Sequence, residues 1–200
     1  LKYPYEILKY LFTKTGLFTS TIAEAGAFIK TKDELEIPNI QFHYAPAMIV
    51  DHGRTLLWGT GMSCHSCLLR PKSLGDVTLA SADPFADPLI DPKFLSHPDD
   101  MKDMVNGYKI MMKVLGSEPF SKYISEHTQR PIDINDDADI EQAMREGADT
   151  VYHPVGTCKM GNDEMSVVDS RLKVHKIQGL RVVDASIMPT IVGGNTNAPT

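Results

Sequence analysis

Hydrophobic positions recur at helical spacing in three parts of the chain, and each part predicts a helix with one buried face. The first covers residues 6–12. The second follows a proline, and Asp99 or Asp100 is expected to cap it. The third, residues 140–146, follows an acidic run whose carboxylates are expected to cap it in the same way. The longest apolar stripe belongs to the second helix and consists of Met101, Met104, Val105, Tyr108, Met111, Met112 and Leu115.

Other stretches are rich in β-branched and aromatic residues and predict strands. They cover residues 39–50, 56–70 and 75–81. Residues 179–184 form a short apolar run that predicts a buried strand, followed by a turn. Residues 83–95 contain three Asp-Pro pairs, which favour extended or turn backbone and predict a structural loop.

Composition limits the class of protein. The chain has 200 residues, 42% of them hydrophobic, which is enough for one substantial core. Its formal net charge of -6 argues against a nucleic-acid-binding protein, which would carry a basic surface. No window of about 18 apolar residues is present, so no membrane-spanning helix is expected.

The cysteines Cys64, Cys67 and Cys158 are too few for a disulfide scaffold. Two of them stand three residues apart in the sequence CHSC, a spacing also found in redox and metal sites. A zinc site would need two more ligands at suitable spacing, and the sequence offers no second pair. The favoured interpretation is a strand with two small side chains and no metal site.

Two segments near the C-terminal end carry candidate chemistry. The segment YHPVGTCKMG places His153 before a proline, and GGNTNAPT places Asn195 after two glycines. A neutral imidazole can accept a proton near pH 7, and an amide can donate a hydrogen bond to an oxygen. Taken singly, such a His is typical of a structural residue and such an Asn is typical of a turn.

These two segments, together with GDVTLASADPFADPLIDPKFL, resemble the C-terminal part of the glucose–methanol–choline (GMC) family of FAD-dependent alcohol oxidoreductases. Within that family the chain is most similar to the insect glucose dehydrogenase (FAD, quinone)-like branch. The resemblance implies an α+β fold. An antiparallel sheet with helices on one face would form a substrate-binding domain over residues 1–150. Residues 151–200 would return to an FAD-binding α/β domain.

The resemblance also implies roles for individual residues. His153 would take the proton of an alcohol, and Asn195 would position the same oxygen while the hydride passes to flavin N5. The residues expected to contact FAD are Asp184, Ala185, Asn195, Asn197, Ala198 and Pro199. The partners would be a small-molecule alcohol (a sugar, a choline-like compound or another alcohol) and an electron acceptor such as a quinone or oxygen.

Two alternatives stay open. One is a non-catalytic member of the fold that acts as a binding or structural protein. The other is a hydroxynitrile-lyase-like flavoprotein, in which the same His would serve as the base.

The Gly-x-Gly-x-x-Gly turn with which the family binds the ADP part of FAD is absent from this sequence. We therefore expect the chain to be a fragment that lacks the start of the protein and the family's closing helix, and that is inactive alone. The compartment stays open, with an extracellular location compatible with the resemblance.

Overall fold

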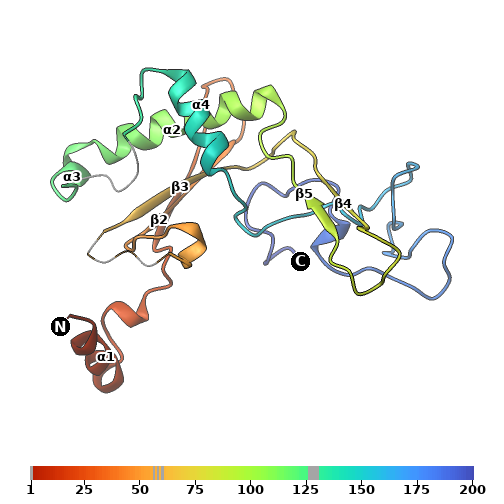
Figure 1. The fold of residues 1–200 in the computed structure, drawn as a ribbon, viewed down its shortest axis with the longest axis horizontal. Helices are drawn as coiled ribbons and strands as arrows, with labels where there is room; N and C mark the ends of the chain where they lie inside the picture. The colour runs from red at the N-terminus through yellow and green to blue at the C-terminus, as the bar shows by residue number, and fades with distance from the viewer. Residues whose placement is uncertain (1, 56, 58, 60, 126–130) are drawn as a thin grey trace.

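The computed structural model describes residues 2–55, 57, 59, 61–125 and 131–200 (Figure 1). Helices and strands are segregated along the chain rather than alternating regularly, which confirms the α+β class. The helices are α1 (Lys2–Thr13), α2 (Pro98–Leu115), α3 (Glu118–Ser121) and α4 (Asp137–Gly147). The strands are β1 (Ala25–Ile29), β2 (Ile40–Ala45), β3 (Ser63–Leu68), β4 (Asp76–Thr78) and β5 (Leu89–Asp91). Short 3-10 turns are η1 (Leu17–Thr19), η2 (Asp51–Gly53) and η3 (Ala185–Ile187).

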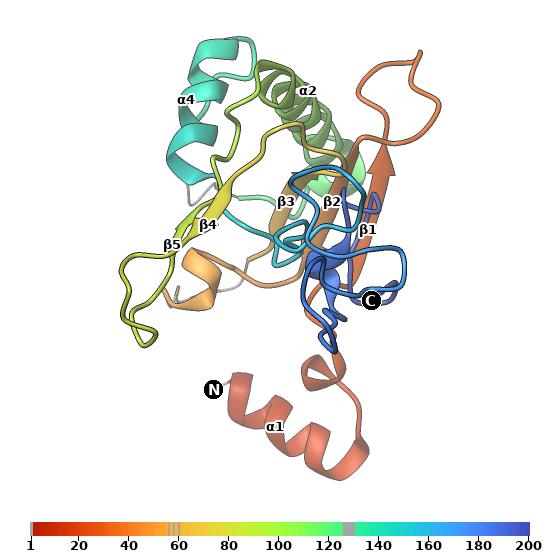
Figure 2. The same ribbon diagram turned by 90° about the vertical axis from the view of Figure 1, so that its right-hand side faces the viewer.

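The central sheet is antiparallel, with the strand order β1-β2-β3. Residues directly opposite each other in neighbouring strands point to the same face, so the register divides the side chains into two sets. Ile40 and Phe42 point to the face that α2 covers, where they pack with Met111. Gln41 and His43 therefore point to the opposite face, here called the helix-free face because none of the described α-helices covers it. Figure 2 shows the C-terminal segment in front of the sheet, away from α2 and α4.

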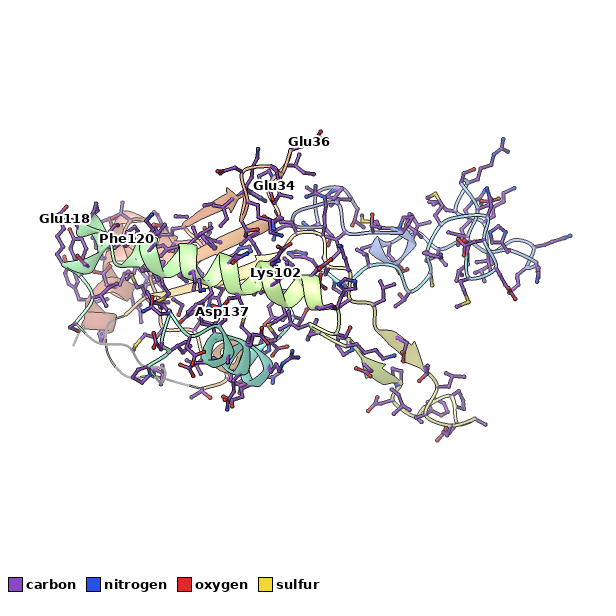
Figure 3. All side chains as sticks on the ribbon, turned by 90° about the horizontal axis from the view of Figure 1, so that it is seen from above. Glu34, Glu36, Lys102, Glu118, Phe120 and Asp137 are labelled. Carbon is purple, nitrogen blue, oxygen red and sulfur yellow. The ribbon has the colours of Figure 1, made fainter. Side chains whose placement is uncertain are left out.

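Helix α2 forms the core with the sheet on one side and α4 on the other. Met101 and Val105 are buried, and both pack with Ile140 of α4. A side chain at Gly107 would press on Ile40, so this position lets α2 lie close to the sheet. Figure 3, seen from above, shows α2 along the sheet, with Phe120 at one end and α4 beside it. The apolar stripe predicted from the sequence is thus the face that α2 buries.

The predicted cap of α2 was wrong. The N-cap residue is His97, whose side chain accepts a hydrogen bond from the N–H of Asp99. Pro98 fills the first helical position, which suits its fixed φ and missing N–H, and this moves the cap one residue back. Asp99 and Asp100 lie in the first turn instead. The prediction that a carboxylate of the acidic run caps α4 is confirmed, because Asp136 accepts a hydrogen bond from the N–H of Ala138.

Asp100 ties α2 to the chain that leaves β3. Its buried carboxylate accepts from the N–H of Lys72 at 2.9 Å, the N–H of Ser73 at 2.8 Å and the hydroxyl of Ser73 at 2.6 Å.

Asp100→Ala leaves these donors without their partner, and we expect it to lower the free energy of unfolding by about 3 kcal/mol. Urea unfolding measures this. Asp99→Ala is the control, since its exposed pair with Lys72 should contribute far less; equal effects would contradict the assignment.

The Asp-Pro segment was predicted as a loop, and this was wrong in part. Residues 89–91 form β5, which pairs antiparallel with β4. The turn signals are real, because the N–H of Ala86 bonds to the carbonyl of Asp83 in the connecting loop. The apolar residues that follow Pro88 nevertheless pair with β4, which is shorter than the predicted strand 75–81.

The predicted buried strand at residues 179–184 was wrong. Leu180 is 49% exposed and Val183 is 70% exposed, and the backbone contributes only an isolated bridge between Lys173 and Arg181. A short apolar run becomes a buried strand only where another layer covers it, and no described residue does so here. The turn predicted after it is present as η3. No helix in the described part of the chain is long and apolar enough to cross a membrane.

Candidate active site

The structure brings His153 and Asn195 together. Nδ2 of Asn195 lies 2.6 Å from Nε2 of His153, although the residues are 42 positions apart. The imidazole is half-buried, whereas the Asn195 side chain is exposed. An exposed amide beside a held imidazole leaves both groups accessible to a small molecule.

Thr196 fixes the other edge of the imidazole. It is 5% exposed, and its hydroxyl lies 3.0 Å from Nδ1 of His153, with its backbone N–H at 3.3 Å. Thr196 thus contacts Nδ1 with a hydroxyl, which can donate or accept, and with a backbone N–H, which can only donate. The Asn195 amide lies at the opposite ring nitrogen, Nε2. The imidazole is therefore held from both of its edges.

Backbone hydrogen bonds hold the His153 segment against η3. The N–H groups of Gly156 and Cys158 both donate to the carbonyl of Ser186, at 3.1 and 3.0 Å. Asp184 caps η3 by accepting from the N–H of Ser186 at 2.8 Å. Hydrogen bonds from the Ser186 hydroxyl and N–H lower the pKa of Asp184, so its exposed carboxylate stays ionised at neutral pH. Asp184 and Ala185 are thus part of the same local unit as His153.

A second contact fixes the residue before His153. Tyr152 has a φ of 67°, a strained value for a non-glycine residue. Its hydroxyl contacts Nδ1 of His52, whose Nε2 contacts the carboxylate of Asp149. The N–H of Thr150 and then His52 lower the pKa of Asp149. The connection between β2 and β3 therefore holds the backbone that leads into His153.

The loop that carries Asn195 depends on its glycines. Gly193 has a φ of 85°, and a Cβ at this position would overlap the guanidinium of Arg70. Arg70 is itself held by a hydrogen bond to the carbonyl of Pro38 at 3.1 Å. The predicted cofactor residues Asn197, Ala198 and Pro199 follow as an exposed turn, in which the N–H of Thr200 bonds to the carbonyl of Thr196 at 3.2 Å.

The helix-free face of the sheet adds groups that the sequence motifs did not indicate. Gln41 is 8% exposed and donates from Nε2 to Oδ1 of Asn195 at 3.1 Å. His43 and His65 stand opposite each other in the register, and Nε2 of His43 lies 3.6 Å from Sγ of Cys67. The alternation in the segment NIQFHYA already placed Gln41 and His43 on one face, and that was the available signal.

Partial burial disfavours protonation of the two histidines on this face. It lowers the pKa of His43, with further lowering by His65 and His153, and it lowers the pKa of His65. Burial raises the pKa of the Cys67 thiol. Within the described residues all three cysteines are free, and no cluster of three or more His, Cys, Asp or Glu side chains is arranged to hold a metal ion.

These shifts predict a dependence of stability on pH. In the unfolded chain both histidines take up protons as the pH falls through about 6.5, whereas in the folded chain they resist protonation. The free energy of unfolding should therefore fall between about pH 7 and pH 5. Thermal unfolding across this range measures it, and the double variant His43→Gln, His65→Gln should show a shallower slope. An unchanged slope would contradict this interpretation.

Comparison with known proteins places the chain in one family of oxidoreductases. The sequence profile of the family described as GMC oxidoreductase matches residues 71–200. An alcohol dehydrogenase [acceptor] from Pseudomonas putida is 45% identical over 194 residues, which are 97% of this chain and 35% of that protein. An oxygen-dependent choline dehydrogenase from Klebsiella pneumoniae is 41% identical over 192 residues, which are 96% of this chain and 35% of that protein. The chain thus spans about a third of the length of these curated relatives.

Solved structures agree in fold. Formate oxidase from Aspergillus oryzae superposes with a TM-score of 0.88 at 25% identity, over 98% of this chain and 39% of that chain. Pyridoxine 4-oxidase from Mesorbium loti superposes with a TM-score of 0.79 at 25% identity, over 89% of this chain and 35% of that chain. The arrangement of helices and antiparallel sheet is therefore one that these oxidases share.

Proposed function

Because the chain belongs to the GMC oxidoreductase family, we propose that the full-length protein is an FAD-dependent alcohol oxidoreductase acting on CH–OH groups. The relatives named alcohol dehydrogenase and choline dehydrogenase support this class of reaction. The observation that carries the proposal is the contact of His153 with Asn195, since it pairs one acceptor with one donor. An alcohol needs both, because its oxygen loses a proton and then bears negative charge.

In the proposed reaction both side chains act on the oxygen of the alcohol. The alcohol hydroxyl donates to Nε2 of His153, which accepts its proton as general base. Nδ2 of Asn195 donates to the same oxygen and stabilises the charge that develops on it. Thr196 contacts the opposite nitrogen, Nδ1, and so holds the ring in place. Both groups hold the oxygen in one place, so that the C–H bond has a fixed direction.

FAD supplies a hydride acceptor when bound. The residues at hand fit such a group, since the exposed turn at Asn197, Ala198 and Pro199 continues directly from Asn195 and leaves backbone open beside the pair. Asp184 presents an exposed, ionised carboxylate that could accept hydrogen bonds from hydroxyl groups. The formate oxidase structure to which the chain is similar concerns the effect of a mutation on FAD modification in that enzyme.

The domain division follows from this proposal. Residues 1–150 form the substrate-binding part, whose helix-free sheet face lies over the active site. Residues 151–200 carry His153 and Asn195 and face the flavin-binding part of the full-length protein. The hydrogen bond of Gln41 with Asn195 supports this placement of the sheet beside the C-terminal loop.

Anaerobic mixing of the full-length flavoprotein with sugars, choline, sterols and simple alcohols tests the function. Bleaching of the flavin by one class of alcohol is the expected result, and that class is the substrate. Release of cyanide from a cyanohydrin without bleaching would replace the proposal by the lyase. A full-length protein that binds no flavin would replace it by the non-catalytic alternative.

A further inference from the structure

The backbone around His153 is held differently on its two sides. After α4 ends, residues 149–152 belong to no helix or strand, and none of the described backbone–backbone hydrogen bonds involves them. On the C-terminal side, by contrast, the N–H groups of Gly156 and Cys158 both donate to the carbonyl of Ser186. The N-terminal side therefore depends on side-chain contacts for its position.

Those contacts come from His52, in the connection between β2 and β3. Its side chain is 19% exposed and lies between two groups of the other segment. Nε2 contacts a carboxylate oxygen of Asp149, and Nδ1 contacts the hydroxyl of Tyr152. The rings of His52 and Tyr152 also lie 5.3 Å apart between centroids. These three residues, here called the His52 latch, join parts of the chain about 100 positions apart.

The latch does not depend on the protonation state of His52. The N–H of Thr150 and then His52 lower the pKa of Asp149, so its carboxylate is ionised at neutral pH and can only accept. The ring nitrogen that faces Asp149 therefore carries a hydrogen. In a neutral ring the other nitrogen accepts from the Tyr152 hydroxyl, and in an imidazolium it donates to the phenol oxygen. Both states keep the two contacts.

The latch acts on a backbone conformation that is unfavourable by itself. Tyr152 has a φ of 67°, in the left-handed region that a bulky residue adopts only where its surroundings impose it. Tyr152 and His153 are consecutive, so a relaxation of Tyr152 would redirect the backbone of the next residue. The imidazole of His153 would then move away from Asn195.

We propose that His52 is a positioning residue for the active-site base: through the hydroxyl of Tyr152 it fixes the backbone that carries His153, and so places the imidazole beside Asn195. This inference rests on the proposed function, because His153 acts as a base only in that chemistry. The described hydrogen bonds of the His52 ring reach Asp149 and Tyr152 only, so His52 acts through Tyr152.

The test is a double-mutant cycle in the full-length flavoprotein, read as the limiting rate of anaerobic flavin reduction at saturating alcohol. Tyr152→Phe keeps the ring and removes only the hydroxyl, and we expect it to slow reduction about tenfold, because a small displacement of a catalytic group is costly. His52→Ala should slow it by a similar factor. The double variant should be no slower than the slower single variant, since both changes remove the same contact.

A conservative variant separates positioning from a general loss of structure. His52 has a φ of 54°, and Asn is one of the few residues that tolerate such a value. The amide of His52→Asn can also accept from or donate to the Tyr152 hydroxyl in place of Nδ1. We expect His52→Asn to keep most of the parent rate, and to bring no recovery over His52→Ala in the Tyr152→Phe background.

The control is Asp51→Asn, in the same turn as His52. Asp51 pairs with Arg54 at 3.6 Å and has no described contact with Tyr152, so the rate should stay at the parent value. A Tyr152→Phe protein that reduces at the parent rate would overturn the positioning role. Losses that multiply in the cycle, or an Asp51→Asn protein as slow as His52→Ala, would overturn it as well.

Amide hydrogen exchange of the full-length protein gives a readout that does not need a substrate. Peptides covering residues 149–158 should exchange faster in His52→Ala and Tyr152→Phe than in the parent and in Asp51→Asn, because the segment opens more often. Unchanged exchange would overturn the latch. A parent protein whose flavin no alcohol reduces would overturn the proposed function instead, and exchange would still decide whether His52 holds this segment.

Discussion

Replacement of His153 by Ala should slow anaerobic flavin reduction by about 10²- to 10⁴-fold, the range for loss of a general base. The imidazole is held from Nδ1 by Thr196, and its Nε2 faces Asn195, an amide that cannot take up a proton in its place. The rate at saturating alcohol should carry most of the loss, because the proton moves in the chemical step. Stopped-flow absorbance of the flavin measures it.

The matched control for this variant is His97→Ala. His97 caps α2, and its described hydrogen bonds and ion pair join it to Ser73 and Asp99, so its loss should cost some stability and leave the reduction rate intact. Flavin content and thermal unfolding of both variants show whether they remain folded. Equal slowing in the two variants would mean that the loss at His153 is structural rather than chemical.

Asn195→Ala should slow flavin reduction by about 10²- to 10³-fold, as for removal of one hydrogen-bond donor from a developing oxyanion. The exposed amide and its 2.6 Å contact with Nε2 place the donor beside the base. Asn195→Asp removes the donor but keeps the size, and should be at least as slow because it adds a negative charge near the oxygen. The same stopped-flow experiment measures both.

A neighbouring residue provides the control for Asn195. Asn197→Ala changes an exposed amide in the same turn that makes no contact with His153 among the described hydrogen bonds. If it lies along the cofactor as proposed, it should alter flavin binding rather than the rate of bound flavin. An Asn195→Ala protein as fast as the parent would remove the amide from the chemistry.

The elements with a strong local pattern were predictable from the sequence. The stripe from Met101 to Leu115 repeats at the helical period over about four turns, and it predicted both the helix and its buried face. The aromatic and β-branched residues of segment 39–50 likewise located β2, although this strand ends at Ala45. The predicted cap was wrong because Asp is a preferred N-cap residue and His is not, whereas the place of Pro98 at the first helical position decided for His97.

Features that depend on distant partners were not predictable in this way. Residues 179–184 look the same in sequence whether another layer covers them or not, so their exposure could only be seen in the fold. The pairing of His153 with Asn195 was expected from two motifs and not from their spacing. Gln41 and Thr196 were missed because their value lies in single hydrogen bonds to these two residues.

The central claim is that Nε2 of His153 accepts the proton of the alcohol. The most direct test is anaerobic flavin reduction in His153→Ala with and without added imidazole. The account predicts slow bleaching that becomes faster in proportion to the imidazole concentration, because the free base replaces the missing group. Bleaching of the variant at the parent rate without imidazole would contradict it.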